Sequence, residues 1–431
     1  MRLEQFTYIF YFLYLMLPEY FAVEISSALP LLTVGRMCIL ILLIAHIVVH
    51  KGKIVFVKLP KLVKCFFAIM IAVNMVHIID VPADSVKALF SIVFEQVTLL
   101  ILIVYSLNTE EKVQNALKYM VWGSAVLGVL GIVEVVTGTN VFYALNTVNR
   151  KMLQASYERL GMLRAEGSFG HPVYYGVYSV SMVAFSLFLY ESSRKKSYLF
   201  IALLNVLGVI LSSSRGQILT LAILFLYMYI NKNKEVRNKY FLVLLGLIPV
   251  FLVILFFVPA LGDGILSIIK STLNAVGFNF EVSNFGDNVD GSYSRLSQLS
   301  GITWAFKQGA WLFGFGANAQ VNGLVRYLTQ WGWSVRKTFD IGYVGIFMQY
   351  GLIGSIGYIC LYGYMFSISK HLRNRFDNKN IFNAFYFYTV ATLLNLLSTV
   401  GVDSVNTIIL GMLIASQSIF LQTKRGRGII E

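Results

Sequence analysis

The stretch PVYYGVYSVSMVAFSLFLYESSRKKS, residues 172–197, combines a long apolar run with a cluster of basic residues at its end. The run from 172 to 191 has the length that a helix needs to cross the hydrocarbon core of a bilayer, about 20 residues. Arg194, Lys195 and Lys196 follow it directly. Because lysine and arginine collect in cytoplasmic connections, the stretch predicts a membrane span that begins outside the cytoplasm and ends inside it.

The composition of the whole chain agrees with a membrane protein. Of its 431 residues, 57% are hydrophobic and only 13% are charged, whereas a soluble domain has about 25% charged residues. The net charge of +14 is explained by basic cytoplasmic connections, so we expect no binding to nucleic acid. The three cysteines, Cys38, Cys65 and Cys360, lie in apolar segments. They are expected to be core residues without disulfides.

Apolar runs of similar length recur along the chain and predict an all-α polytopic membrane protein with a single membrane domain, residues 1–431. We expect about 12 spans of the length that crosses a bilayer, at residues 6–23, 28–49, 62–80, 86–106, 113–137, 172–191, 197–212, 216–231, 240–262, 341–367, 381–400 and 404–422. An even number of spans places both termini on one side of the membrane. The basic connections assign that side to the cytoplasm.

Two connections on the predicted outer side are long, residues 138–171 and residues 263–340. Loops of such length are usually functional. Apolar stretches in the later one predict short amphipathic helices near the interface. It also holds four tryptophans that we expect to contact glycan: Trp304, Trp311, Trp331 and Trp333. Because tryptophan collects at membrane interfaces in any case, an aromatic belt is the alternative reading.

The motif SSSRG, residues 212–216, places Arg215 at the predicted start of a span. Three serine hydroxyls before it can cap the helix. A cation is unfavourable at this end of a helix dipole unless it meets an anion there. Backbone N–H groups and a guanidinium that converge on one point predict a phosphate site. An arginine that only reaches toward the interface from a tight turn is the alternative.

The motif RAEGSFGH, residues 164–171, precedes the span at 172–191. Its glycines allow close approach of the backbone, and Pro172 suits the first turn of a helix. Arg164, Glu166 and His171 are expected just outside the lipid, where they can meet a polar substrate. A histidine that merely bonds to a carbonyl at the interface is the alternative for His171.

Glycine-rich motifs also mark the end of the later outer connection. WLFGFGANAQ, residues 311–320, contains Gly314 and Gly316, which permit tight turns. In the following segment, residues 338–358, glycines at helical spacing predict a stripe for close helix packing. Asp340 opens this segment. It is expected either to cap the helix or to act as a catalytic carboxylate.

Taken in order, RAEGSFGHPVYYG, SSSRG, SRLSQLSGITWAF, LFGFGANA and DIGYVGIFMQYGLIG resemble the motifs of the O-antigen ligase and O-antigen or capsular polysaccharide polymerase superfamily. The resemblance covers roughly residues 160–360. It implies transfer of a growing glycan from undecaprenyl diphosphate to the hydroxyl of an acceptor sugar, at the outer face of the bacterial cytoplasmic membrane. It implies no metal or other cofactor. Its partners would be the lipid-linked oligosaccharide and membrane lipid, and a chain-length regulator is left open.

The resemblance also suggests roles for individual residues. By position, Arg164, Arg215 and Arg295 match arginines that hold the diphosphate leaving group in such enzymes. Ligases of the superfamily carry a histidine where this chain has Asp340, whereas polymerases more often carry an aspartate there. This departure favours a polymerase. Asp340 is then the first candidate for the catalytic base, followed by Glu166 and His171.

Two other functions stay open from the sequence. One is a ligase that moves finished glycan to a lipid or protein acceptor. The other is a transporter or glycan flippase with the same number of spans. A transporter would carry ionisable residues within its spans near the midplane, and only a few candidates lie there, chiefly Arg36, Glu95 and Glu134.

Overall fold

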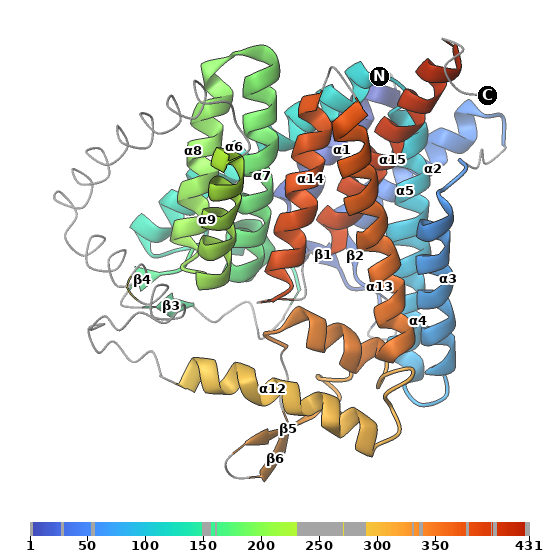
Figure 1. Ribbon diagram of the computed structural model, residues 1–431, viewed down its shortest axis with the longest axis vertical. Helices are drawn as coiled ribbons and strands as arrows, with labels where there is room; N and C mark the ends of the chain where they lie inside the picture. Colours follow the sequence, from blue (N-terminus) through green and yellow to red (C-terminus); the bar gives the residue numbers. More distant parts are fainter. Residues whose placement is uncertain are drawn as a thin grey trace.

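The structure, a computed structural model, is mostly helical (Figure 1). It describes residues 3–26, 30–52, 57–148, 157–159, 162–230, 270, 290–329, 332–335, 339–375, 379–397, 399 and 403–426. Within these residues the strands form three short antiparallel pairs. The expected helical class is therefore confirmed for the described chain, with small strand pairs that the hydropathy pattern did not predict.

The helices follow the predicted apolar runs. Their bounds are α1 Leu3–Met16, α2 Val34–Val49, α3 Lys61–Val76, α4 Pro82–Phe90, η1 Ser91–Thr98, α5 Leu99–Ser106, α6 Glu110–Thr137, α7 Pro172–Ser193, α8 Lys196–Leu211, α9 Arg215–Ile230, α12 Asp290–Lys307, α13 Gly342–Arg375, α14 Lys379–Asn395 and α15 Asp403–Gly426. The strands are β1 Ala22–Val23, β2 Leu32–Thr33, β3 Glu158–Arg159, β4 Met162–Leu163, β5 Arg326–Thr329 and β6 Gly332–Val335. Two 3₁₀ turns lie at Val141–Leu145 and Gly167–Phe169.

Among the described residues, five helices are long and apolar enough to cross a membrane: Pro82–Ser106, Glu110–Thr137, Pro172–Ser193, Gly342–Arg373 and Ser404–Gln422. Other predicted spans correspond to shorter apolar helices, such as α2, α8 and α9, of 16 residues each. A helix of that length reaches only about 24 Å, less than the hydrocarbon core of about 30 Å. The predicted span 240–262 lies outside the described residues, so the count of about 12 stays a prediction.

Helix α7 lies at the centre of the bundle, between α6, α8 and α14. In its most apolar window, 83% of the residues are buried. Small residues let the neighbouring helices approach Tyr175, because a Cβ atom at Gly131 or Gly208 would lie within 2.8 Å of the Tyr175 hydroxyl oxygen. That hydroxyl donates to the Leu127 carbonyl at 3.2 Å. Close packing through small residues is the usual way for helices to associate in a membrane.

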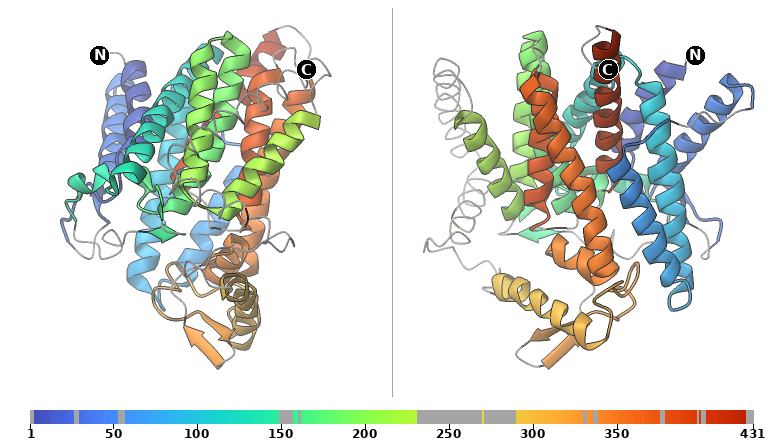
Figure 2. Two further views of the ribbon diagram at one scale, coloured as in Figure 1. Left: turned by 90° about the vertical axis from the view of Figure 1, so that its left-hand side faces the viewer. Right: turned by 45° about the vertical axis from the view of Figure 1, so that its right-hand side comes forward.

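The two ends of the bundle differ. The start of α1 and the end of α15 lie at one end (Figure 1). The opposite end, called the α12 end below, carries α12, the β5–β6 pair and the loops next to them (Figures 1 and 2). The predicted long connections, residues 138–171 and 263–340, contribute their described parts to this end. That both connections lie outside the cytoplasm stays a prediction.

Helix α13 is broken at Gly351, which has φ 64° and ψ −162°. This conformation is essentially restricted to glycine. The expected stripe of glycines for helix packing is therefore wrong as a single stripe. Gly357 does face Phe66 and Ile69 of α3, but a Cβ atom at Gly351 would lie 2.4 Å from the carbonyl of Leu312 in another loop.

The loop 311–316 fills the break in α13. Phe315 N–H and Gly316 N–H donate to the carbonyls of Met348 and Gln349, at 2.8 and 3.0 Å. In return, the N–H groups of residues 352 and 353 donate to the carbonyls of residues 311 and 312, at 2.9 and 3.1 Å. The backbone groups that the break would leave unpaired are thus satisfied. We call this arrangement the glycine clasp, because Gly314 and Gly351 meet in it.

The described part of the late connection, residues 290–340, has a small core of its own. The buried residues of this core come from α12, the following loop, β5 and the start of α13: Ala305, Ala319, Val325, Tyr327, Phe339, Val344 and Met348. Among the described residues stand one helix of 18 residues, α12, and the β5–β6 pair. The apolar stretch GILSIIKSTLNAVGF, residues 264–278, in which another short amphipathic helix was expected, lies outside the described residues except for residue 270. A segment with its own core is a fixed platform at the α12 end.

Candidate functional site

Arg164 joins two motifs that lie 48 residues apart in the sequence. Its Nε donates to the carbonyl of Ser212 at 2.9 Å, and its Nη2 donates to Ser214 Oγ at 3.0 Å. The backbone N–H of Ala165 also donates to the carbonyl of Leu211, at 3.0 Å. These bonds fix the plane of the guanidinium. The motifs RAEGSFGH and SSSRG therefore lie side by side at the mouth of α7, α8 and α9.

The chain turns sharply between α8 and α9. Ser213 has φ 50°, a left-handed conformation that few residues other than glycine adopt. The Ser214 carbonyl accepts from the N–H of Gln217 at 3.1 Å and so begins the first turn of α9. Arg215 is the first residue of this helix and is half-buried. The start of a helix at Arg215 is as the sequence predicted, and a helix N-terminus favours an anion; the anion site itself stays a prediction.

His171 caps α7, and its Nδ1 accepts from the N–H of Val173 at 3.2 Å. Burial lowers the pKa of His171 to about 4; the Arg164 cation also lowers this pKa, and the Asp340 carboxylate opposes them. Both charges therefore lie close enough to act on the imidazole. At neutral pH the ring is uncharged, and because Nδ1 is an acceptor, the proton is assigned to Nε2. In this tautomer His171 offers a donor at Nε2 and no base.

Glu166 is buried, with 3% of its surface exposed. One carboxyl oxygen accepts from Asn140 Nδ2 at 3.3 Å and from the Tyr143 hydroxyl, and Oε2 accepts no hydrogen bond. Burial raises the pKa of Glu166, while the bonds from Tyr143 and Asn140 and the Arg164 cation lower it. In this conformation a sugar hydroxyl cannot reach the Glu166 carboxyl group. Among the three predicted catalytic residues it is thus the least accessible.

Glu134, near the end of α6, holds the backbone of the RAEGSFGH motif. Its carboxylate accepts from the N–H of Glu166 at 3.2 Å and from the N–H of Gly167 at 3.0 Å. Asn140 Nδ2 donates to the Gly167 carbonyl at 2.9 Å from the other side. Sequence reasoning noted Glu134 only as an ionisable residue in a span. That property is a general signal of function in membrane proteins, and it could have identified this contact.

Asp340 lies next to the start of α13, which begins at Gly342. Its Oδ2 accepts from Gln298 Nε2 at 2.6 Å, and its N–H donates to Gln298 Oε1 at 3.0 Å. Gln298 is fully buried in α12. The side-chain amide of Gln298 therefore binds both the carboxylate and the backbone N–H of Asp340. Gln298 was missed from the sequence, where a lone glutamine in a polar segment carries no signal.

The structure brings Arg164, Arg215, His171 and Asp340 to one end of the bundle. Arg295 belongs to α12, but its side chain lies outside the described residues, and so does Trp331. Three of the predicted tryptophans, Trp304, Trp311 and Trp333, lie on the late connection rather than at the start of α7. Their rings contact other aromatic rings: Trp304 lies next to Trp333, and Trp311 is stacked on Phe306.

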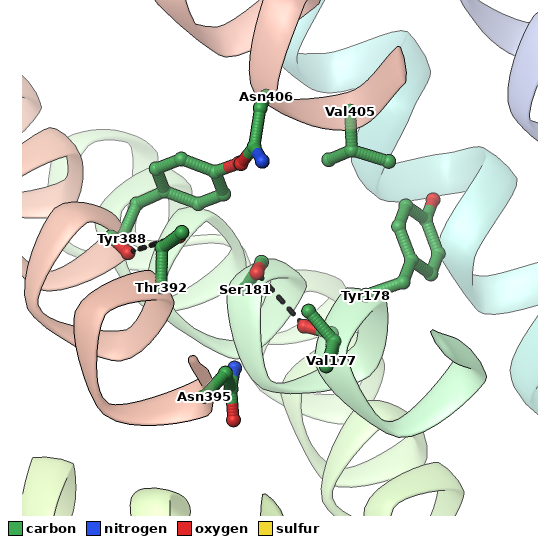
Figure 3. Close-up of a pocket in the computed structure, with 8 residues that line it drawn as sticks. All are labelled: Val177, Tyr178, Ser181, Tyr388, Thr392, Asn395, Val405 and Asn406. Atoms are coloured by element: carbon green, nitrogen blue, oxygen red, sulfur yellow. Dashed lines mark hydrogen bonds between the residues drawn. The ribbon is translucent and has the colours of Figure 1, made fainter. Parts of the chain in front are cut away.

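A small pocket lies deeper in the bundle, between α7, α14 and α15 (Figure 3). It is lined by Val177, Tyr178, Ser181, Tyr388, Thr392, Asn395, Val405 and Asn406. Ser181 Oγ donates to the Val177 carbonyl at 2.8 Å, and the Thr392 hydroxyl donates to the Tyr388 carbonyl at 2.9 Å. The pocket has a volume of about 10 Å³, which fits one water molecule. A glycan cannot occupy it, so it is no substrate site in this conformation.

Comparison with known proteins gives no relative: the sequence matches neither a family model nor a curated protein. Within the described part of the chain, no three of the histidine, cysteine, aspartate and glutamate side chains gather as metal ligands. The site offers four groups for chemistry. They are a fixed guanidinium, the N-terminus of α9 with its arginine, a neutral imidazole and an anchored carboxylate.

Proposed function

We propose that this protein is a polysaccharide polymerase. It joins oligosaccharide repeat units that are carried on undecaprenyl diphosphate, on the outer face of the bacterial cytoplasmic membrane, and its product is an O-antigen, capsule or exopolysaccharide chain. In this proposal the α12 end of the bundle faces outward and both termini are cytoplasmic. The apolar helices that can cross a membrane support the membrane location.

One observation carries the proposal: Arg164 is bonded to Ser212 and Ser214, directly before Arg215 at the start of α9. In this proposal both guanidiniums and the N-terminus of α9 bind one anion. Arginine binds a phosphate with two parallel hydrogen bonds, which a lysine cannot do. The anion site stands at the ends of apolar helices, where the diphosphate of a lipid-linked sugar would be presented.

The reaction is a single displacement at the anomeric carbon of the donor sugar. The hydroxyl oxygen of the acceptor sugar attacks this carbon, and the bond from the carbon to the diphosphate oxygen breaks. Negative charge grows on the lipid diphosphate as it leaves, so Arg164 and Arg215 stabilise the transition state more than the bound substrate. The configuration of the anomeric carbon is inverted.

Asp340 accepts the proton of the attacking hydroxyl. Its carboxylate is held by Gln298, and Asp340 and Arg164 both affect the pKa of His171, which supports a position for Asp340 near the arginine site. A positioned base contributes about 10²- to 10⁴-fold to the rate. The neutral His171 donates from Nε2 to an oxygen of the substrate. Glu166 and Glu134 do not contact the substrate in this proposal. Glu134 accepts hydrogen bonds from the N–H groups of Glu166 and Gly167 and so fixes the backbone between Arg164 and His171.

The test uses the purified full-length protein in vesicles with lipid-linked repeat units. Polymerase activity gives a ladder of glycan chains that remain on the lipid. Asp340→Asn should shorten the ladder to single units, because the amide cannot take the proton. Asn115→Asp, which adds a carboxylate at a site near the start of α6, serves as a matched control and should leave the ladder unchanged.

Three outcomes would contradict the proposal. Movement of the substrate across the bilayer without any polymer would indicate a transporter. Transfer of finished chains to a second acceptor, with no growth of the chains, would indicate a ligase. A full ladder from a folded Arg164→Ala variant would remove the anion site from the reaction.

A further inference from the structure

Four residues of the late connection form one compact group, which we call the indole platform: Trp304, Lys307, Arg326 and Trp333. The Trp304 and Trp333 rings lie 5.1 Å apart. The Arg326 guanidinium carbon lies 5.3 Å from the centre of the Trp304 ring, and Lys307 Nζ lies 5.2 Å from the centre of the Trp333 ring. Each indole thus has a cation and the other indole as neighbours.

The platform is anchored by the backbone. Trp304 Nε1 donates to the carbonyl of Leu324 at 3.1 Å. Arg326 pairs with Val335 in the β5–β6 register, and Leu328 pairs with Trp333. Tyr327 between them is buried against α12, so the alternating neighbours Arg326 and Leu328 face outward. Rings and strands therefore hold the two cations in place before any ligand binds.

Both cations keep their capacity to bind an anion. Lys307 and Arg326 are exposed, and within the described residues neither forms an ion pair with a carboxylate. This differs from Arg36, whose charge is balanced by Glu95 in the bundle. A cation over an indole face retains its N–H donors at the edge. Two such cations on a fixed surface favour an external anionic partner.

The place of the platform indicates which anion it meets. The β5–β6 pair lies beyond the ends of the bundle helices in every view (Figures 1 and 2). A position past the ends of the apolar helices favours a partner in water over a lipid headgroup. Indoles beside cations also suit a sugar with an acidic group, because the C–H groups of the sugar ring pack on an aromatic face while the acid contacts the cation.

We propose that the indole platform binds an anionic glycan: a carboxylate or phosphate on a sugar contacts Arg326 and Lys307. The inference rests on the proposed function and specifies its substrate class, repeat units that carry an acidic sugar. The platform would hold the growing chain while the diphosphate end stays at Arg164 and Arg215. Neutral glycans would lack the main contact.

The experiment measures binding of two probes to the full-length protein in nanodiscs of zwitterionic lipid. The acidic probe is a hexamer of galacturonate, and the neutral probe is maltohexaose. We expect the acidic hexamer to bind, and its affinity to fall when salt is raised. The double variant Arg326→Gln with Lys307→Gln should weaken it by about 100-fold, about tenfold for each lost charged hydrogen bond. Maltohexaose should bind weakly to both proteins.

A matched control stands at the other end of the molecule. Lys370 lies over the Phe366 ring at 5.9 Å and is also exposed, so Lys370→Gln removes the same kind of contact far from the platform. It should leave binding of the acidic hexamer unchanged. Equal affinity for both probes, or an unchanged affinity in the double variant, would overturn the inference.

A third arm separates lipid from glycan. In this arm, binding of the protein to vesicles with anionic phosphatidylglycerol is measured. If the double variant binds these vesicles more weakly but binds the acidic hexamer as before, the platform contacts the membrane, and the inference is overturned. The polymer ladder provides the remaining distinction. A protein that builds a ladder but ignores the acidic hexamer leaves the polymerase proposal intact and removes only the acidic substrate.

Discussion

The two connections at the α12 end are fixed by different kinds of contact. Around Arg164, the contacts mainly involve side chains: the guanidinium, two serines and the buried Glu134 form a polar network. In the late connection the contacts are mainly between backbone groups, because the glycine clasp joins loop 311–316 to α13 through main-chain bonds. Exposed rings then cover the outer surface.

Under the proposed function, this difference separates the groups that act on the leaving diphosphate from the surface that binds the glycan. A charged leaving group needs donors that are already oriented, and a side-chain network supplies them. A long glycan needs an accessible surface on a stable base, which a backbone clasp provides without using any functional group. The first connection should therefore respond to charge and pH, and the second to steric change.

The largest effect is expected at Arg164. Arg164→Ala removes a preoriented donor and should lower the rate of polymer formation by about 100- to 1,000-fold. Arg164→Lys should also be poor, since lysine lacks the fork. Rates are compared in vesicles with equal protein. Arg194→Ala, at the opposite and exposed end of α7, is the control and should keep the full rate.

An added side-chain atom in the glycine clasp should be enough to destabilise the protein. Gly351→Ala forces an alanine into a conformation reserved for glycine and places its Cβ atom 2.4 Å from the Leu312 carbonyl. We expect a loss of about 3 kcal/mol in unfolding free energy. Thermal unfolding in detergent measures it. Gly363→Ala lies on the same helix with no atom within 4 Å of the added carbon, and a loss of equal size there would contradict the clasp.

A smaller loss of stability is expected at Glu134. Glu134→Ala leaves the buried N–H groups of Glu166 and Gly167 without an acceptor, which costs about 2 kcal/mol. Glu134→Gln keeps one oxygen acceptor and should be milder. Glu111→Ala, on an exposed turn of the same helix, should change stability by less than about 0.5 kcal/mol. If Glu134→Ala were as mild as this control, the polar network would not fix the motif.

The last expected effect is a change of stability with pH. The pKa of His171 is about 4 in the folded protein and 6.5 when unperturbed. Between these values the unfolded chain binds a proton that the folded protein does not bind, so the contribution of His171 to stability is complete above pH 6.5 and is lost as the pH falls toward 4.

The variant His171→Asn keeps a capping side chain and removes this titration. Its stability should therefore approach or pass that of the natural protein as the pH falls from 6.5 to 4. Unfolding is followed at several pH values in this range. A stability difference that does not change with pH would show that His171 titrates normally. The Gly351→Ala difference has no titrating group in it and should stay constant.

The sequence predicted those features that depend on local pattern. Apolar length placed most of the helices, and the serine motif placed Arg215 at the start of a helix, where the structure bonds Arg164 to the preceding Ser212 and Ser214. Contacts between distant segments were not predictable in the same way. Gly351 looks like its neighbours in a glycine stripe, and only the loop 311–316 packed against it reveals why its backbone must turn.

Residue types with two possible roles were also difficult to assign from the sequence. Glu166 follows Arg164 closely in the sequence, which suggests a shared site, yet its carboxyl group turns toward Asn140 and Tyr143. Trp304 and Trp333 were expected on sugar, and each already contacts a cation. Side-chain direction depends on neighbours from other elements, and a single sequence does not contain that information.

The glycine clasp has a consequence for how the chain could diversify. Its two halves, at Gly314 and Gly351, are fixed to each other by backbone bonds that do not depend on the residues between them. Between them lie the β5–β6 pair, Asp340 and the first turns of α13, and doubling the length of a flexible loop costs only about 0.6 kcal/mol. A longer connection beside the β5–β6 pair should therefore leave the clasp, and with it the break in α13, in place.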